Sequence, residues 1–176
     1  MHFMHSPKLE EARAFAVKMH GPQRYGAHPY VHHLDAVVAI LEPFGLEAQT
    51  IGYLHDVVED TEATVADVQS LFGEEVAQCV TLLTDEPGID RKERKTKTYA
   101  KLAGVSGVLE VALVVKAADR LANVRACVAD GNIGLWSVYQ SEQVVFKISA
   151  FRLGLCGAIW SELELLLSSE NRPLSV

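Results

Sequence analysis

The stretch His55-Asp56-Val57-Val58-Glu59-Asp60-Thr61 places an imidazole and three carboxylates in an otherwise apolar run. On a helix, Glu59 lies three positions after Asp56 and four after His55, and Asp60 lies four after Asp56. Residues at these spacings share one face of a helix. This concentration of ligand and acid/base groups predicts that the face is a site, and the rest of the chain must fold around it.

Other polar residues occur in apolar helical surroundings, at the histidine pair His32-His33 and at Asp119. An unpaired polar group is costly to bury there, which argues against the alternative that His55-Asp56 is a helix cap or a solvated acidic face. Two histidines and two aspartates from three segments suit a divalent ion such as Mn, Fe, Co or Zn. Chemistry alone does not choose between His32 and His33, since both could point inward at a helix start.

Apolar periodicity and turn residues predict a helical chain. We expect a loop at 23–30 and a continuous helix over 47–59 that carries His55-Asp56. A capping box at Thr64-Val65-Ala66-Asp67 should start a helix that ends at Phe72-Gly73. Further helices are expected at 7–19, 74–83, 107–127, 135–150 and 153–168.

Five cations occur between Arg91 and Lys97. A charge run of this kind usually forms a solvated helix face. The alternative is that one or two of the cations face the site, because a chain of net charge −7 must still attract an anionic substrate.

With 176 residues, the chain is long enough to form one domain over 1–176, with a core at about 7–167 and a loose tail at 168–176. It has no basic tail, no run of 18 apolar residues and no C-x-x-C pair. We therefore expect a soluble cytoplasmic protein that binds neither nucleic acid nor membrane. Its oligomeric state is left undecided by the sequence.

Four segments of the chain resemble the HD metal-dependent phosphohydrolases. Their sequences are PYVHHLDAVVAIL, GYLHDVVEDTEAT, FGEEVAQCVTLLTDE and VVKAADRLANVRA. They are most similar to the hydrolase domain of the Rel/Spo family and to stand-alone small alarmone hydrolases, from about Leu9 to Asn123. The resemblance implies an all-α HD-domain helical bundle with a central metal site. It implies the ligands His33, His55, Asp56 and Asp119, and so selects His33, although Leu34 replaces the family's usual proline.

The resemblance also implies a substrate-binding set. Arg24 matches an arginine that faces the guanine base, and Asn123 matches an asparagine that contacts the nucleotide. Tyr25 stands where the family usually has a second cation, and Ala126 stands where it often has a small hydroxyl residue. Lys116 and Asn123 bracket Asp119 by three and four residues, so all three can lie on one stripe of a helix.

The activity implied is Mn-dependent hydrolysis of the 3′-diphosphate of (p)ppGpp, giving GDP or GTP and pyrophosphate. Glu59 and Asp60 would act as bases or proton shuttles, or alternatively would orient the metal ligands. The departures at Tyr25 and Ala126 favour a rival, an HD phosphohydrolase acting on another nucleotide or dinucleotide phosphate. A second rival is a non-catalytic nucleotide-binding module, against which the intact ligands argue.

Overall fold

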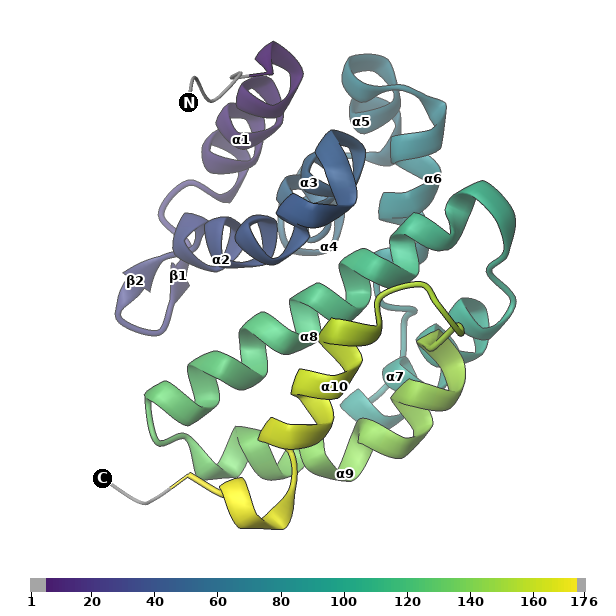
Figure 1. The fold of residues 1–176 in the computed structure, drawn as a ribbon. Helices are drawn as coiled ribbons and strands as arrows, with labels where there is room; N and C mark the ends of the chain where they lie inside the picture. The colour runs from purple at the N-terminus through teal and green to yellow at the C-terminus, as the bar shows by residue number, and fades with distance from the viewer. Residues whose placement is uncertain (1–5, 174–176) are drawn as a thin grey trace.

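The computed structural model describes residues 6–173, which fold into a bundle of ten α-helices (Figure 1). They are α1 (Pro7–His20), α2 (Val31–Leu41), α3 (Gly45–Leu54), α4 (Val57–Asp60), α5 (Val65–Phe72), α6 (Glu74–Leu83), α7 (Arg91–Ala103), α8 (Val111–Ala129), α9 (Ile133–Ala150) and α10 (Gly157–Leu166). Short 3-10 turns occur at η1 (Glu42–Phe44), η2 (Gly107–Glu110) and η3 (Ser169–Asn171). The predicted all-α class is confirmed.

The long helix α8 forms the axis of the bundle. It runs between α2 and α3 on one side and α9 and α10 on the other, and it also contacts α6 (Figure 1). Most of its residues are small or branched apolar side chains that are fully buried, such as Val115, Ala118 and Val124. A helix that is apolar around most of its circumference must be covered on most sides, which accounts for its central place.

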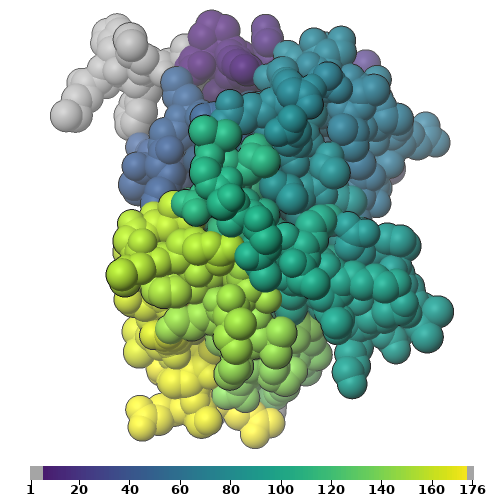
Figure 2. All heavy atoms as spheres, turned by 90° about the vertical axis from the view of Figure 1, so that its right-hand side faces the viewer, coloured from purple at the N-terminus to yellow at the C-terminus, as the bar shows by residue number. Residues whose placement is uncertain are grey.

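In the face shown in Figure 2, early segments of the chain form the upper half and later segments the lower half. In the lower half the teal residues of α7 lie beside the green residues of α9, and these two helices contact one another. None of the helices in residues 6–173 is long and apolar enough to cross a membrane.

The expected continuous helix over 47–59 is wrong. The helix α3 ends at Leu54, His55 and Asp56 form a turn, and α4 begins at Val57. The His55 Nδ1 atom lies 2.7 Å from the carbonyl oxygen of Gly52 and donates to it. Because that carbonyl would accept the next helical N–H, the side chain competes with the helix at the point where it breaks.

Other boundaries were predicted more closely. The capping box is confirmed, with Thr64 and Asp67 bonded reciprocally, and α5 ends at Phe72 before Gly73. The expected loop at 23–30 instead contains a two-stranded antiparallel hairpin, β1 (Arg24–Tyr25) and β2 (His28–Pro29). The start of the expected helix at 107–127 is a 3-10 turn, η2, and α8 continues to Ala129.

The tail expected to be loose, 168–176, is described by the structure only as far as residue 173. Between residues 168 and 173, the tail contains η3 and the buried Pro173. Leu174 to Val176 lie outside the described residues, as do residues 1–5. The buried apolar cluster extends from Ala12 to Leu167.

Helices α2 and α3 pack closely at Gly52. A Cβ atom built at Gly52 would lie 2.6 Å from Leu41 Cδ1 and 3.3 Å from Val38 Cγ2. Leu41 is fully buried, so its side chain has little room to move away.

We predict that Gly52→Ala lowers the free energy of unfolding by about 1–3 kcal/mol, because the added methyl overpacks this contact. Denaturant unfolding of the metal-free protein measures the change. The matched control is Gly157→Ala in α10, where the added methyl meets no heavy atom within 4 Å. That variant should be unchanged or more stable by up to about 1 kcal/mol. Equal effects of the two changes would contradict the close packing of α2 on α3.

Candidate metal centre and its cleft

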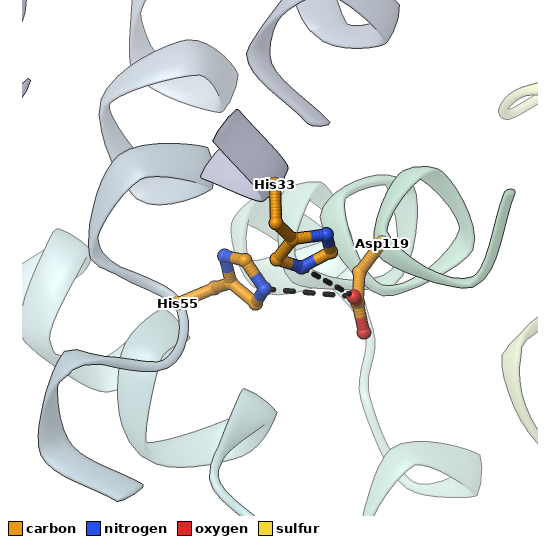
Figure 3. Close-up of side chains that lie close together, drawn as sticks. All are labelled: His33, His55 and Asp119. Atoms are coloured by element: carbon orange, nitrogen blue, oxygen red, sulfur yellow. Dashed lines mark ion pairs between the residues drawn. The ribbon is translucent and has the colours of Figure 1, made fainter. Parts of the chain in front are cut away.

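Three predicted ligands meet at one point (Figure 3). His33 comes from α2, His55 from the turn between α3 and α4, and Asp119 from α8, and their donor atoms all lie within 4.8 Å of one another. Asp119 Oδ1 is 3.3 Å from His33 Nε2 and 3.6 Å from His55 Nε2. The three side chains point toward one another from two helices and a turn, as ligands of a shared ion do.

The histidine that chemistry left undecided is resolved by burial. His33 is 2% exposed and belongs to the cluster. His32 is exposed and stacks on His28, with the ring centroids 4.3 Å apart. The cluster therefore uses His33.

The tautomer of His55 suits a metal ion. Since Nδ1 donates to the Gly52 carbonyl, the free lone pair of a neutral ring is on Nε2. That Nε2 atom is buried and has no hydrogen-bond partner. Burial alone would lower the pKa of His55, but the carboxylates of Asp56 and Asp119 outweigh burial and raise it. The site thus attracts positive charge to Nε2, and its nitrogen and oxygen donors fit a divalent metal ion.

Asp56 borders this cluster. Its Oδ2 atom lies 3.0 Å from His55 Nε2 and 3.9 Å from His33 Nε2, and it accepts a 2.5 Å hydrogen bond from the Tyr30 hydroxyl. Burial would raise the pKa of Asp56, but His55 outweighs it and holds that pKa well below its usual range. The carboxylate is therefore ionised and within reach of both imidazoles.

Two residues expected to bind substrate, Tyr25 and Asn123, also contact the predicted ligands. The Asn123 amide donates to Asp119 Oδ1 at 2.6 Å and to the Asp119 carbonyl at 3.0 Å. The Tyr25 hydroxyl donates to Asn123 Oδ1 at 2.8 Å, and its ring stacks on His33 at 4.7 Å. We call this chain of contacts the Tyr25–Asn123 latch. Sequence analysis missed both this arrangement and Tyr30, whose signal was an aromatic residue three positions before His33.

Arg24 lies away from the other predicted site residues. It is exposed on β1, and its guanidinium donates to the Ala27 carbonyl within the same hairpin. It does not line the cleft described next.

A cleft of about 250 Å³ opens over the metal ligands. Four carboxylates and four cations line it, together with aromatic and neutral side chains. The lining residues are Tyr25, Tyr30, His33, Asp56, Glu59, Asp60, Arg91, Lys95, Lys116, Asp119, Arg120, Asn123 and Tyr139.

The predicted acid/base residues are both held by hydrogen bonds at the cleft. Glu59 Oε2 accepts from the backbone N–H of Asp85 at 2.8 Å, and Asp60 Oδ2 accepts from the Gln23 amide at 3.1 Å. Desolvation raises the pKa of Glu59, and the Asp85 N–H partly opposes that rise. A carboxylate with a raised pKa exchanges a proton more readily near neutral pH.

The basic run on α7 is divided between solvent and cleft. Arg91 and Lys95, four residues apart, line the cleft, whereas Lys97 forms an exposed pair with Glu93 at 2.5 Å. Arg91 forms two hydrogen bonds with Glu142, at 2.8 and 3.1 Å. Two of these cations thus face the site, and the other three, Lys92, Arg94 and Lys97, are exposed, as expected for a solvated helix face.

The other two cations that line the cleft, Lys116 and Arg120, are buried residues of α8. Lys116 is 7% exposed and donates to the Leu83 carbonyl, with its Nζ 3.8 Å from Asp119 Oδ2. Burial would lower its pKa, but Asp119 and the other cleft carboxylates raise it, so Lys116 stays charged. Arg120 is 5% exposed and lies over the rings of Tyr139 and Phe146, 4.6 Å from each centroid.

Comparison with known proteins agrees with this centre. The HD domain family model matches residues 12–156. The chain belongs to the HD domain family. The resemblance predicted from the sequence is therefore confirmed.

Curated relatives of this HD domain are much longer proteins. The guanosine-3′,5′-bis(diphosphate) 3′-pyrophosphohydrolase of Aquifex aeolicus is 30% identical over 160 residues, which is 89% of this chain and 22% of the relative. A probable enzyme of the same name from Synechocystis is 33% identical over 87% of this chain and 21% of its own length. The chain spans about a fifth of these relatives.

A solved structure matches the HD domain over nearly its whole length. It is a metazoan ortholog of SpoT, described as hydrolysing ppGpp, with a TM-score of 0.72 and 26% identity. The match covers 93% of this chain and 97% of that one.

We predict that the purified protein holds about one divalent ion per chain and that His55→Ala or Asp119→Ala loses it, because each removes a donor from the cluster. Elemental analysis of desalted protein measures the content. His33→Ala and His32→Ala form a matched pair, since only His33 points into the cluster. Loss of metal from His32→Ala but not from His33→Ala would contradict the ligand set.

Proposed function

We propose that this chain is a cytoplasmic, Mn-dependent hydrolase that removes the 3′-diphosphate of (p)ppGpp, giving GDP or GTP and pyrophosphate. The observation that carries the proposal is the buried His33, His55 and Asp119 cluster beneath a cleft with carboxylates and cations. The relatives named as pyrophosphohydrolases of this nucleotide support the choice of substrate. Asp56 is proposed as the fourth ligand, because its Oδ2 lies within 3.9 Å of both imidazoles.

The bound ion would polarise a phosphoryl oxygen and lower the pKa of a water molecule. Glu59 and Asp60 are proposed to handle the protons of the reaction, Glu59 as base because its pKa is raised by desolvation. Each is oriented by one hydrogen bond, which keeps its second carboxylate oxygen available to a water molecule or the leaving group.

The cations of the cleft are proposed to hold the phosphate groups. A chain with a net charge of −7 needs a local basic surface to bind a polyanion, and Arg91, Lys95, Lys116 and Arg120 provide one. Ammonium and guanidinium groups form strong charge-assisted hydrogen bonds with phosphate oxygens. Asn123 is proposed to orient Asp119, with nucleotide contact dependent on opening of the Tyr25–Asn123 latch.

One observation favours a second candidate, hydrolysis of a different nucleotide phosphate. Arg24 does not line the cleft, and the Tyr25 hydroxyl is bonded to Asn123. The residues that the Rel/Spo resemblance assigns to the guanine base are therefore not arranged around an open base site. The cluster and the cleft cations would serve either substrate.

A substrate panel separates these candidates. We expect Mn-loaded protein to release pyrophosphate from ppGpp and pppGpp, with little or no orthophosphate, because the cleft would act on the bond between ribose and diphosphate. Chromatography of the nucleotide products together with separate pyrophosphate and orthophosphate assays measures the outcome. Efficient turnover of another nucleotide with ppGpp left intact would establish the second candidate.

We predict that Glu59→Gln keeps the fold and the metal but loses about 100- to 10,000-fold in kcat, the usual worth of a positioned acid/base group. Because the pKa of Glu59 is raised, the wild-type rate should fall on the acid side of its pH profile at a pH above 4.5, the ordinary pKa of a glutamate. Activity is lost there as the pH falls, because the base becomes protonated. Kinetics across pH measures both effects. Glu62→Gln, an exposed neighbour, is the control and should match wild type. A Glu59→Gln rate within about twofold of wild type would limit Glu59 to a structural role.

A further inference from the structure

Three cleft residues are anchored on one short segment, Leu83–Asp85, which begins at the last residue of α6. The Leu83 carbonyl accepts from Lys116 Nζ at 3.1 Å, and the Asp85 N–H donates to Glu59 Oε2 at 2.8 Å. The Asp85 carboxylate contacts Lys95 Nζ at 2.7 Å. The three anchored residues come from α8, α4 and α7, and all line the cleft, whereas Asp85 does not.

The segment is itself held in place. Thr84 N–H continues the hydrogen bonding of α6 by donating to the Val80 carbonyl at 3.0 Å. From α7, Lys101 Nζ donates to the carbonyls of Thr81 and Thr84, at 3.0 and 2.8 Å. These bonds satisfy carbonyls that would otherwise be unpaired at the end of α6, so the segment is a firm support.

The Asp85 carboxylate is an unusual group to find in such a position. Its side chain is 6% exposed, and its Oδ1 atom is buried without a hydrogen-bond partner. A buried carboxylate is costly unless a cation neutralises it, and the Lys95 ammonium, itself only 16% exposed, meets its other oxygen. Burial would raise the pKa of Asp85, but Lys116 and Lys95 outweigh burial and lower it.

We propose that Asp85 is a positioning residue of the cleft, which fixes Glu59 through its backbone N–H and Lys95 through its carboxylate. The inference rests on the proposed phosphohydrolase function and extends it to a residue outside the cleft. Asp85 sets the proton-handling carboxylate and a phosphate-binding cation at a constant separation before substrate enters.

The chemistry of both partners fits this role. The Asp85 N–H occupies one oxygen of Glu59, so the carboxylate keeps one orientation and its other oxygen remains available. An ammonium has three donors, and Asp85 uses one, so Lys95 can still donate to a phosphate oxygen. Preorganised charges of this kind need not reorient when charge develops on the phosphate.

A double-mutant cycle on the full-length, Mn-loaded protein tests the proposal. The variants are Asp85→Asn, Lys95→Gln and the pair combined. The matched control is Glu86→Gln, which removes the same charge one residue away and breaks the 2.7 Å pair of Glu86 with Lys101. Two readouts are needed: kcat and KM for ppGpp, and the calorimetric affinity for inorganic pyrophosphate, which does not depend on turnover. Circular dichroism and metal content verify each variant.

We expect Lys95→Gln to weaken pyrophosphate binding by about tenfold, the worth of one charge-assisted hydrogen bond. Asp85→Asn should weaken it by a similar factor, and the double variant should be no weaker than Lys95→Gln alone, because Asp85 acts through Lys95. Both single variants should act mainly on KM and leave kcat within about twofold of wild type, because the backbone N–H that orients Glu59 remains in Asp85→Asn. Glu86→Gln should match wild type in both readouts.

Two outcomes separate this proposal from the proposed function. If wild type leaves ppGpp intact but the pyrophosphate cycle shows the expected coupling, the substrate assignment fails and the role of Asp85 toward Lys95 stands. If ppGpp is cleaved and Asp85→Asn behaves like Glu86→Gln, or if its effect adds independently to that of Lys95→Gln, the positioning role is overturned. Should Asp85→Asn not fold, Asp85→Glu replaces it in the cycle, since it keeps the charge and moves the carboxylate by one methylene.

Discussion

The structure depends on the burial of acidic and imidazole groups at one point. Asp119 is on the central helix, and the two imidazoles that meet it come from α2 and from the turn after α3, on one side of α8. A carboxylate in this position is costly unless it is matched by positive charge and hydrogen bonds. His33, His55 and Asn123 supply those partners, which ties α2 and the turn before α4 to α8. The same demand for positive charge makes the point suitable for a divalent ion.

Acidic and basic side chains are also paired around the cleft above this cluster. The cleft brings four carboxylates and four cations together, although the chain as a whole is acidic. Carboxylates behind the cleft, Asp85 and Glu142, hold Lys95 and Arg91 by direct ion pairs. Lys95 and Arg91 are therefore each oriented by an acid that does not itself line the cleft. A polyanionic substrate would meet donors that are already in place, at a smaller entropic cost than flexible surface lysines would impose.

Much of the fold and of the inner site could be predicted from the sequence because the signals were local. The capping box at Thr64, the glycine after Phe72 and the apolar spacing of α8 each specify a local conformation, and the structure has all three. The family resemblance selected His33, and burial agrees with it. The break at His55 was missed because helical spacing does not reveal that an imidazole takes the Gly52 carbonyl. The Tyr25–Asn123 latch and the contacts of Asp85 join residues far apart in the chain, which no local pattern specifies.

The two parts of the site differ in how far family membership defines them. The candidate metal ligands are constrained by donor geometry, which few residue types satisfy, so membership of the HD domain family favours this part of the site. In the proposed function, recognition of a base would depend instead on the hairpin and on α8 beyond Asn123, where this chain has Tyr25 and Ala126. There a phenol that bonds to Asn123 replaces a cation, and its ring covers His33. The residue that departs from the family is thus coupled directly to a metal ligand and to the partner of Asp119. In the proposed function, a nucleotide that displaces Tyr25 would break its hydrogen bond to Asn123, so the choice of nucleotide would be linked to the residue that orients Asp119.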